Sequence, residues 1–282
     1  VAVAQDGCLC RPSDQVRVIH MVKRVLQNLL GDLRLQHLTP DTSDVLQMQA
    51  LMIRKKPFLR KLYEEWYRSI SRMIPTAISG PILELGAGGG FLHDILPGVI
   101  RSDILADGNS DILLDGLRLP MQSRVLKAIV MVDVFHHLPA VELFLCEAAR
   151  CIRPGGVVVM IEPWHTRWSR LMYRWLHPEP FEPEARDWGF PAGQPLSRSN
   201  QALPWIVFER DREVFRRRFP QWSLRELTLH TPFRYLVSGG VAYRALMPGA
   251  AFKHWRRIEN ALKPWMNSWA MFATITLKRE KN

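Results

Sequence analysis

Hydrophobic and polar positions follow two different periods along the 282-residue chain, and the change falls near residue 81. Before it, apolar residues recur three and four positions apart, which predicts amphipathic helices over 14–39 and 55–74. After it, short apolar runs alternate with segments of helical period. These runs predict strands at 82–85, 99–104, 112–115, 127–132 and 156–161, and helices at about 90–96 and 140–152. Strands that alternate with helices indicate an α/β fold with a doubly wound parallel sheet.

The regular alternation stops at Pro163. Residues 163–203 are rich in Pro, Trp, Arg and Glu, and a short basic helix is expected at 208–219, so we predict an insertion over 164–220. Three further elements close the chain: a strand near 223–229, a helix near 251–262 and a strand at 269–277. We therefore predict a helical extension over 1–78 and one domain over 79–282, in which the insertion forms a cap.

The net charge of +11 is unevenly distributed along the chain. Residues 1–150 hold 17 Lys and Arg against 16 Asp and Glu, whereas residues 151–282 hold 21 against 11. Nine of the ten tryptophans also follow residue 160. Such a basic, Trp-rich half attracts nucleic acid, phosphorylated molecules or anionic lipid headgroups, or else is a solvated face over an aromatic core. Composition alone leaves both interpretations open.

The four cysteines predict neither a disulfide framework nor a metal centre. A zinc site needs C-x-x-C or paired Cys and His ligands, and the chain has neither pattern. His136 and His137 are adjacent, so we expect their side chains to diverge, which is poor ligand geometry. The prediction is a reduced protein without a metal.

Residues 82–90 hold the most informative chemistry of the chain. They read Ile-Leu-Glu-Leu-Gly-Ala-Gly-Gly-Gly, a buried strand that runs into a glycine cluster. Glycine lets such a turn reach positive φ and brings backbone N–H groups close to a ligand. A dinucleotide-binding loop needs G-x-G-x-x-G, and its third glycine would fall on Phe91. The stretch instead resembles the first motif of class I S-adenosylmethionine (SAM)-dependent methyltransferases, in which a carboxylate precedes G-x-G-x-G.

Four further segments resemble the same family in their order along the chain. Asp103 ends the second strand, 19 residues after Glu84. The other segments are Asp115-Gly116-Leu117-Arg118-Leu119-Pro120 after the third strand, His136-His137-Leu138-Pro139 after the fourth, and Arg153-Pro154-Gly155-Gly156 before the fifth. Over residues 81–163 the chain therefore resembles the methyltransferase type 11 group. The resemblance implies a Rossmann-like, seven-stranded, mostly parallel sheet and SAM as the cofactor.

The resemblance also implies which residues form the site. Asp103 is placed to accept from the ribose hydroxyls, and Asp115 to accept from the adenine amino group. The expected cofactor-binding residues are Glu84, Gly86, Ala87, Gly88, Gly90, Asp103, Asp115, Gly116, Leu117 and Asp133. The candidate catalytic residues are Asp133, His136 and His137, because they follow the fourth strand at the ligand-bearing edge. Either histidine is a candidate general base, and packing of the turn is the alternative role for both.

The expected reaction is in-line transfer of the sulfonium methyl to an aligned nucleophile, with water excluded. We expect O-methylation of a small-molecule acceptor, or of one linked to a lipid or sugar and held by the N-terminal helices and residues 164–220. Nucleic acid is not the expected acceptor, because the fourth strand leads into Asp133-Val134-Phe135-His136 and not Asn/Asp-Pro-Pro-Tyr/Phe. Nor is a nucleophilic cysteine expected, since helical spacing predicts that Cys146 is buried.

Two alternatives come from other classes of protein: a SAM-binding module without catalysis, and an NAD(P)-dependent oxidoreductase. The first five residues, 1–5, have the small-residue pattern of a signal-peptide cleavage site. Since SAM is an intracellular cofactor, we nevertheless expect a cytoplasmic protein. The basic second half adds the hypothesis of peripheral association with an anionic membrane.

Overall fold

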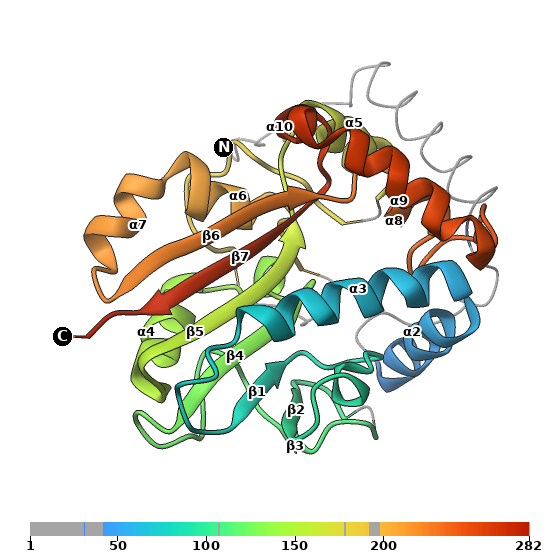
Figure 1. The fold of residues 1–282 in the computed structure, drawn as a ribbon. Coiled ribbons are helices and arrows are strands. Elements are labelled where there is room, and N and C mark those ends of the chain that lie inside the picture. Colours follow the sequence, from blue (N-terminus) through green and yellow to red (C-terminus); the bar gives the residue numbers. More distant parts are fainter. Residues whose placement is uncertain (1–30, 32–41, 107, 178, 192–197, 282) are drawn as a thin grey trace, which may run out of the picture.

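Seven strands form one sheet in the computed structural model, which describes residues 31, 42–106, 108–177, 179–191 and 198–281. Their bounds, in sheet order, are β3 (Ile112–Leu113), β2 (Val99–Asp103), β1 (Ile82–Leu85), β4 (Leu126–Val132), β5 (Ile152–Pro163), β7 (Phe272–Arg279) and β6 (Trp222–His230) (Figure 1). β7 runs antiparallel to both of its neighbours, β5 and β6, whereas β3, β2, β1, β4 and β5 pair in parallel. The predicted seven-stranded, mostly parallel sheet is confirmed.

Side chains along β4 alternate between two hydrophobic cores, one on each face of the sheet. Ile129 and Met131 belong to the core that includes α4 (Val141–Cys151) and α7 (Arg212–Arg218). Ala128 and Val130 belong to the opposite core, over which α3 (Pro57–Met73) packs (Figure 1). Successive side chains of a strand point to opposite faces, so a strand that is covered on both sides reads as a continuous apolar run.

The remaining helices surround the edge at which the parallel strands end. They are α2 (Ser43–Lys55), α5 (Arg167–Leu176), α6 (Leu203–Trp205), α8 (Arg234–Ser238), α9 (Phe252–Ala261) and α10 (Met266–Trp269). α2 and α3 lie near the end of β1, whereas α5 and α10 lie near the end of β5 (Figure 1). Among the described residues, every helix is too short or too polar to cross a membrane.

Two predicted elements of the sheet region are shorter than expected. The helix predicted at 90–96 is a single 3₁₀ turn, Leu92–Asp94, because Pro97 and then Gly98, at φ +80°, divert the chain. The strand predicted at 112–115 ends at Leu113, and Asp115 instead pairs with Arg118 across a turn. Apart from Gly31, the helix predicted at 14–39 lies outside the described residues.

The region after the fifth strand is more regular than its composition predicted. α5 begins with a capping box that the sequence analysis missed: Thr166 Oγ1 accepts from the Ser169 N–H at 3.1 Å, and Ser169 Oγ accepts from the Thr166 N–H at 2.7 Å. The basic helix predicted at 208–219 divides into a π-helical turn, Ile206–Arg210, and α7.

The prediction that Cys146 is buried is wrong, because this residue is exposed on α4.

A buried ion-pair cluster at Arg234 joins three helices. The Arg234 guanidinium donates to Glu65 of α3 at 2.8 and 3.0 Å and also pairs with Glu259 of α9. Glu259 additionally accepts from the backbone N–H groups of Phe233 and Arg234, at 3.0 and 2.7 Å, where α8 begins. Arg234 and Glu259 are each 4% exposed, so neither charge has water as an alternative partner.

Arg234→Met should lower the free energy of unfolding by about 3–5 kcal/mol, because it leaves the Glu259 carboxylate buried and uncompensated. Urea denaturation measures this quantity. The matched control is Arg68→Met, which removes a solvent-exposed pair with Glu64 on α3 and should cost less than about 1 kcal/mol. Equal losses in the two variants would contradict the anchoring role of Arg234.

Candidate active site

A cavity of about 830 Å³ opens at the carboxyl ends of β1, β2 and β4. Its walls include α2 and α3 on one side and the segment after α5 on the other. The structure brings all of the predicted site residues to its lining: Glu84, Gly86, Ala87, Gly88, Gly90, Asp103, Asp115, Gly116, Leu117, Asp133, His136 and His137. Their individual roles stay predictions.

The glycine loop after β1 is packed so closely by its neighbours that Gly86 and Gly89 have no room for a side chain. Gly86 has φ +68°, and a Cβ there would lie 2.5 Å from Val134 Cγ2. At Gly89 a Cβ would lie 2.4 Å from the backbone nitrogen of Ala50, so α2 rests directly on the loop. The Ala87 N–H donates to the Ser102 carbonyl at 2.8 Å, which ties the loop to β2. The loop is therefore preorganised to present its backbone to a ligand.

The two acids that are expected to bind the adenosine both lie in the cavity lining. Asp103 is 5% exposed; its Oδ2 accepts from the Gly88 N–H at 3.0 Å and its Oδ1 from the Leu105 N–H at 3.1 Å. Asp115 accepts from the Leu117 N–H at 2.9 Å. Both carboxylates are thus fixed at the cavity wall by neighbouring backbone. Carboxylates in this position suit the hydroxyl and amino donors of an adenosine.

Two further acids give the cavity floor an affinity for positive charge. Burial raises the pKa of the Glu84 carboxyl to about 8, although Arg101 opposes the effect. Burial also raises the pKa of Asp133 to about 8, with His136 opposing it. A cationic ligand favours the ionised forms of both carboxyl groups, because its positive charge offsets the cost of burying a negative one. SAM carries a sulfonium and an ammonium group, so the electrostatics of the floor fit this cofactor.

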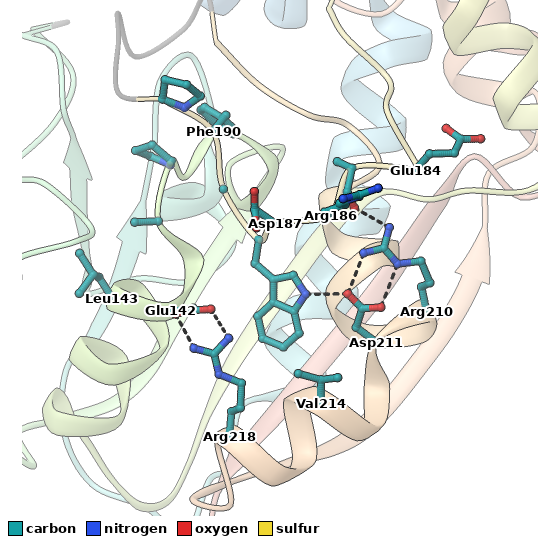
Figure 2. A pocket seen from close by; sticks show the side chains of 16 residues that line it. Glu142, Leu143, Glu184, Arg186, Asp187, Phe190, Arg210, Asp211, Val214 and Arg218 are labelled. Carbon is teal, nitrogen blue, oxygen red and sulfur yellow. Dashed lines mark hydrogen bonds and ion pairs between the residues drawn. The ribbon is translucent and has the colours of Figure 1, made fainter.

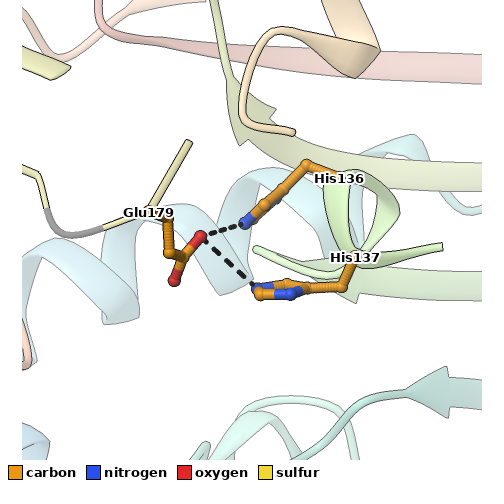
Figure 3. A group of neighbouring side chains, drawn as sticks. All are labelled: His136, His137 and Glu179. Atoms are coloured by element: carbon orange, nitrogen blue, oxygen red, sulfur yellow. Dashed lines mark ion pairs between the residues drawn. The ribbon is translucent and has the colours of Figure 1, made fainter. Parts of the chain in front are cut away.

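His136 and His137 converge on one carboxylate instead of diverging (Figure 3). Their ring centroids are 4.3 Å apart, and the two residues lie in a 3₁₀ turn, Phe135–His137. Glu179 Oε2 lies 3.4 Å from His136 Nε2 and 3.7 Å from His137 Nε2. His136 Nδ1 donates to Glu162 Oε2 at 2.7 Å, so its ring is held between two carboxylates.

The two histidines carry different charges. Burial alone would lower the pKa of His136, but its hydrogen bonds to Glu162 and Glu179 raise it to about 10, so the ring is an imidazolium at neutral pH. Burial, and then the charge of His136, lower the pKa of His137 to about 4. Nδ1 of neutral His137 donates to the Arg198 carbonyl at 3.3 Å, which leaves the lone pair on Nε2. For Glu179, burial would raise the pKa, but the bond from His136 holds it well below its usual range.

The same side chains could in principle hold a divalent cation. The ligand atoms of His136, His137 and Glu179 lie within 4.8 Å of one another, as do those of Asp133, His136 and Glu162. A metal needs the imidazole lone pair of His136, whereas the two flanking carboxylates favour a proton there. We therefore interpret the cluster as an ion-pair network, and the absence of a metal from the site stays a prediction.

Several cavity residues were missed by the sequence analysis. Tyr63 and Tyr67 of α3 and Tyr235 of α8 line the cavity, as do Gln49 of α2 and Gln201. The spacing of Tyr63 and Tyr67, four residues apart on one helix face, was the available signal. Glu179 had no signal, because it comes from the irregular segment after α5. Burial raises the pKa of the Tyr63, Tyr67 and Tyr235 hydroxyls, so these three phenols stay neutral.

Figure 2 shows the lining of a second cavity, of about 890 Å³. Pro139 and Phe190 line both cavities. Four of the second cavity's charged side chains are paired: Arg218 with Glu142, and Arg210 with Asp211 at 2.8 Å. The Trp188 indole N–H also donates to Asp211, at 2.9 Å. The glycine loop and the histidines face the first cavity, so that cavity is the candidate active site.

Comparison with protein families supports this assignment: residues 83–160 match the family model described as a methyltransferase domain. This match spans β1 to β5 and includes the glycine loop, Asp103, Asp115 and the two histidines. With the seven-stranded sheet, this match shows that residues 83–160 belong to a methyltransferase domain, which supports SAM-dependent methyl transfer and SAM as the cofactor. A search of curated proteins gives no match.

Solved structures similar to this chain have low sequence identity. A chain of the complex between the Haloferax volcanii Trm112 methyltransferase activator and a methyltransferase is 14% identical, with 83% of this chain and 96% of that chain covered and a TM-score of 0.45. Geranyl diphosphate C-methyltransferase from Streptomyces coelicolor A3(2) is 12% identical, with coverage of 96% and 99% and a TM-score of 0.46. The citrinin polyketide synthase CMeT domain is 12% identical, with coverage of 95% and 68% and a TM-score of 0.47. Likenesses at this level leave the acceptor unassigned.

Asp103→Ala should weaken SAM binding by about 10- to 100-fold, because hydrogen bonds to a charged group contribute about 1.5–3 kcal/mol each. Isothermal titration calorimetry measures the affinity. Asp111→Asn is the matched control: Asp111 lies on the connection that follows Asp103, but pairs with Arg101 outside the cavity, at 2.6 Å, and its loss should leave affinity unchanged. Unchanged affinity in Asp103→Ala would remove this residue from the cofactor site.

Nitrogen NMR of the imidazole rings should show His136 doubly protonated at neutral pH and His137 neutral with Nδ1 protonated. Because the folded pKa of His136, about 10, exceeds its ordinary 6.5, its ion pairs stabilise the fold fully below pH 6.5 and lose their effect as the pH rises through 10. Titration with Zn²⁺ should leave both ring spectra unchanged. A neutral His136 at neutral pH, or zinc-dependent shifts in both rings, would contradict the ion-pair network.

Proposed function

We propose that this methyltransferase transfers the methyl group of SAM to a hydroxyl oxygen of a small-molecule acceptor, or of an acceptor linked to a lipid or sugar. The observation that carries the proposal is the place of His137 in the cavity lining, with its Nε2 3.7 Å from Glu179 Oε2; burial there lowers the pKa of the ring to about 4. A hydroxyl is a poor nucleophile at neutral pH and needs a group that takes its proton. An amine or an activated carbon has less need of such a base.

The acceptor half of the cavity is suited to a compound rich in hydroxyl groups. Tyr63 and Tyr235 present aromatic rings with hydroxyl tips, and Gln201 adds a side-chain amide. Gln201 Nε2 lies 3.2 Å from Glu179 Oε2, so the amide and the carboxylate form one polar wall. Stacking on aromatic rings together with polar hydrogen bonds is a usual mode of holding a sugar-like or polyhydroxylated molecule.

His137 would act late in the transfer. SAM supplies a methyl group that is already electrophilic, so the protein has to align the acceptor oxygen and exclude water. As the oxygen gains the methyl group, its proton becomes far more acidic than an imidazolium, and His137 can accept it despite a pKa of about 4. His136 would act through its charge, holding Glu179 in place to orient the acceptor. Asp133 would remain on the cofactor side of the cavity floor.

We propose no nucleic-acid acceptor, because the segment after β4 lacks the Asn/Asp-Pro-Pro-Tyr/Phe pattern of amino-methylating enzymes. A cytoplasmic location, and a lipid-linked acceptor reached from an anionic membrane, form part of the proposal. The basic, Trp-rich second half of the chain supports the membrane association.

Methyl-labelled SAM, incubated with the protein and with aqueous or organic-solvent cell extracts, should yield a labelled methyl ether or ester. Against that acceptor, His137→Gln should lower kcat by about 100-fold or more with little change in the KM for SAM, since it removes the proton acceptor. The control His93→Gln, outside the cavity lining, should retain full activity.

Label on nitrogen or carbon would contradict O-methylation, and full activity in His137→Gln would remove the base. SAM binding without label transfer to any extract would instead favour the non-catalytic module.

A further inference from the structure

Exposed cations and tryptophans of this chain gather on one surface, formed by α5, α9, α10 and the turn Lys263–Trp265 that links the last two helices. α5 contacts α10, and α9 contacts the linking turn, so the surface is continuous. It lies at one end of the molecule, beyond the carboxyl end of β5 (Figure 1). We name it the α5/α9/α10 surface.

Basic residues follow one face of each long helix of this surface. On α5 the exposed positions 167, 170, 171 and 174 are Arg, Arg, Leu and Arg, which are spaced as a single helical stripe. On α9 the exposed positions 253, 256 and 257 are Lys, Arg and Arg at the same spacing. Lys263 adds a further cation in the turn.

Acidic side chains are almost absent from these four elements. Among their described residues the single acid is Glu259, which is 4% exposed and bonded to Arg234. Acids from other elements reach Arg170 and Arg256, at 3.4 and 3.7 Å. For Arg174 and Arg257 the structure describes no ion pair, so these charges face solvent. A uniformly basic surface is complementary to a layer of anionic groups.

Large apolar side chains are exposed among these cations. Trp265 is 58% exposed and Leu171 47%, whereas Trp269 and Ile258 are each 37% exposed. Trp269 is held on its buried side by Trp168 and Phe233, at ring-centroid distances of 5.3 and 5.7 Å. Rigid tryptophans beside lysines and arginines are typical of a surface that inserts at the boundary between lipid headgroups and acyl chains.

The same elements lead directly to the acceptor side of the cavity. α5 ends at Leu176, and the cavity-lining residues His177 and Glu179 follow it. α8, which packs on α9, contributes Tyr235 to the cavity wall. A molecule anchored in a layer against this surface would therefore reach the cavity from its acceptor side.

We propose that the α5/α9/α10 surface docks on a bilayer that contains anionic lipids, with Trp265 inserted at the headgroup level. The docking is argued from the α5/α9/α10 surface alone and does not depend on the reaction. The consequence that the acceptor is lipid-linked and enters from the bilayer rests on the proposed function.

Co-sedimentation of the full chain with vesicles tests the docking. The protein should bind vesicles of phosphatidylcholine with phosphatidylglycerol, and bind vesicles of phosphatidylcholine alone at least roughly tenfold more weakly, because each basic residue near an anionic surface adds to the affinity. Binding should weaken as salt shortens the Debye length from about 10 Å at 0.1 M to about 3 Å at 1 M.

Arg174→Glu/Arg257→Glu should lower vesicle binding by roughly tenfold or more. Arg217→Glu/Arg225→Glu makes the same change in net charge at exposed positions on α7 and β6, and should retain binding. Trp265→Ala should also weaken binding, whereas Leu143→Ala, which removes a side chain of α4 that is 57% exposed, should not. Unchanged thermal unfolding and SAM affinity would show that the variants remain folded.

Equal binding to both kinds of vesicle, or equal loss in the two charge variants, would overturn the docking surface. Tighter binding to RNA than to the anionic vesicles would overturn it too, in favour of a nucleic-acid surface. Methylation of a soluble acceptor without vesicle binding would remove the docking and leave the proposed function standing. Vesicle binding by a protein that transfers no methyl group from SAM would leave the docking standing and remove the proposed function.

Discussion

The Glu162 carboxylate, at the end of β5, is the constraint on which the candidate site depends. It is fully buried, and its Oε1 accepts from the backbone N–H groups of Val134 and Phe135, at 2.9 and 2.8 Å. Its Oε2 accepts from His136 Nδ1. One side chain thus fixes both the turn after β4 and the orientation of the ring that the turn carries. Hydrogen bonds to an ionised acceptor are stronger than neutral ones, so the turn is held more firmly than a loop usually is.

The sheet was predictable from the sequence because its strands are covered on both sides. Burial on two faces requires continuous apolar runs, and such runs at 82–85 and 127–132 are visible without a structure. Elements that depend on local chain geometry were harder to predict. The turn at Leu92–Asp94 contains helix-forming residues but is too short, between the glycine loop and Pro97, to become a helix.

The cofactor half of the site was predictable for the same reason, since its residues follow strands in a fixed order. The acceptor half was not. Glu179 comes from an irregular segment, and its approach to His136 depends on a contact between residues 43 positions apart. The convergence of His136 and His137 also contradicted expectation, because a 3₁₀ turn places adjacent side chains differently from an extended chain. Sequence spacing alone therefore predicts neither the approach of Glu179 to His136 nor the convergence of the two histidines.

The contact between Gly89 and Ala50 has a consequence for how the chain can be divided. The glycine loop belongs to the segment that matches the methyltransferase domain, whereas Ala50 belongs to α2, more than 30 residues before that segment begins. Backbone rests on backbone there, with no side chain between them to absorb a displacement. The recognisable motif is therefore not a self-sufficient module: a chain cut ahead of the sheet would keep every residue of the fingerprint and lose the wall that shields them from solvent.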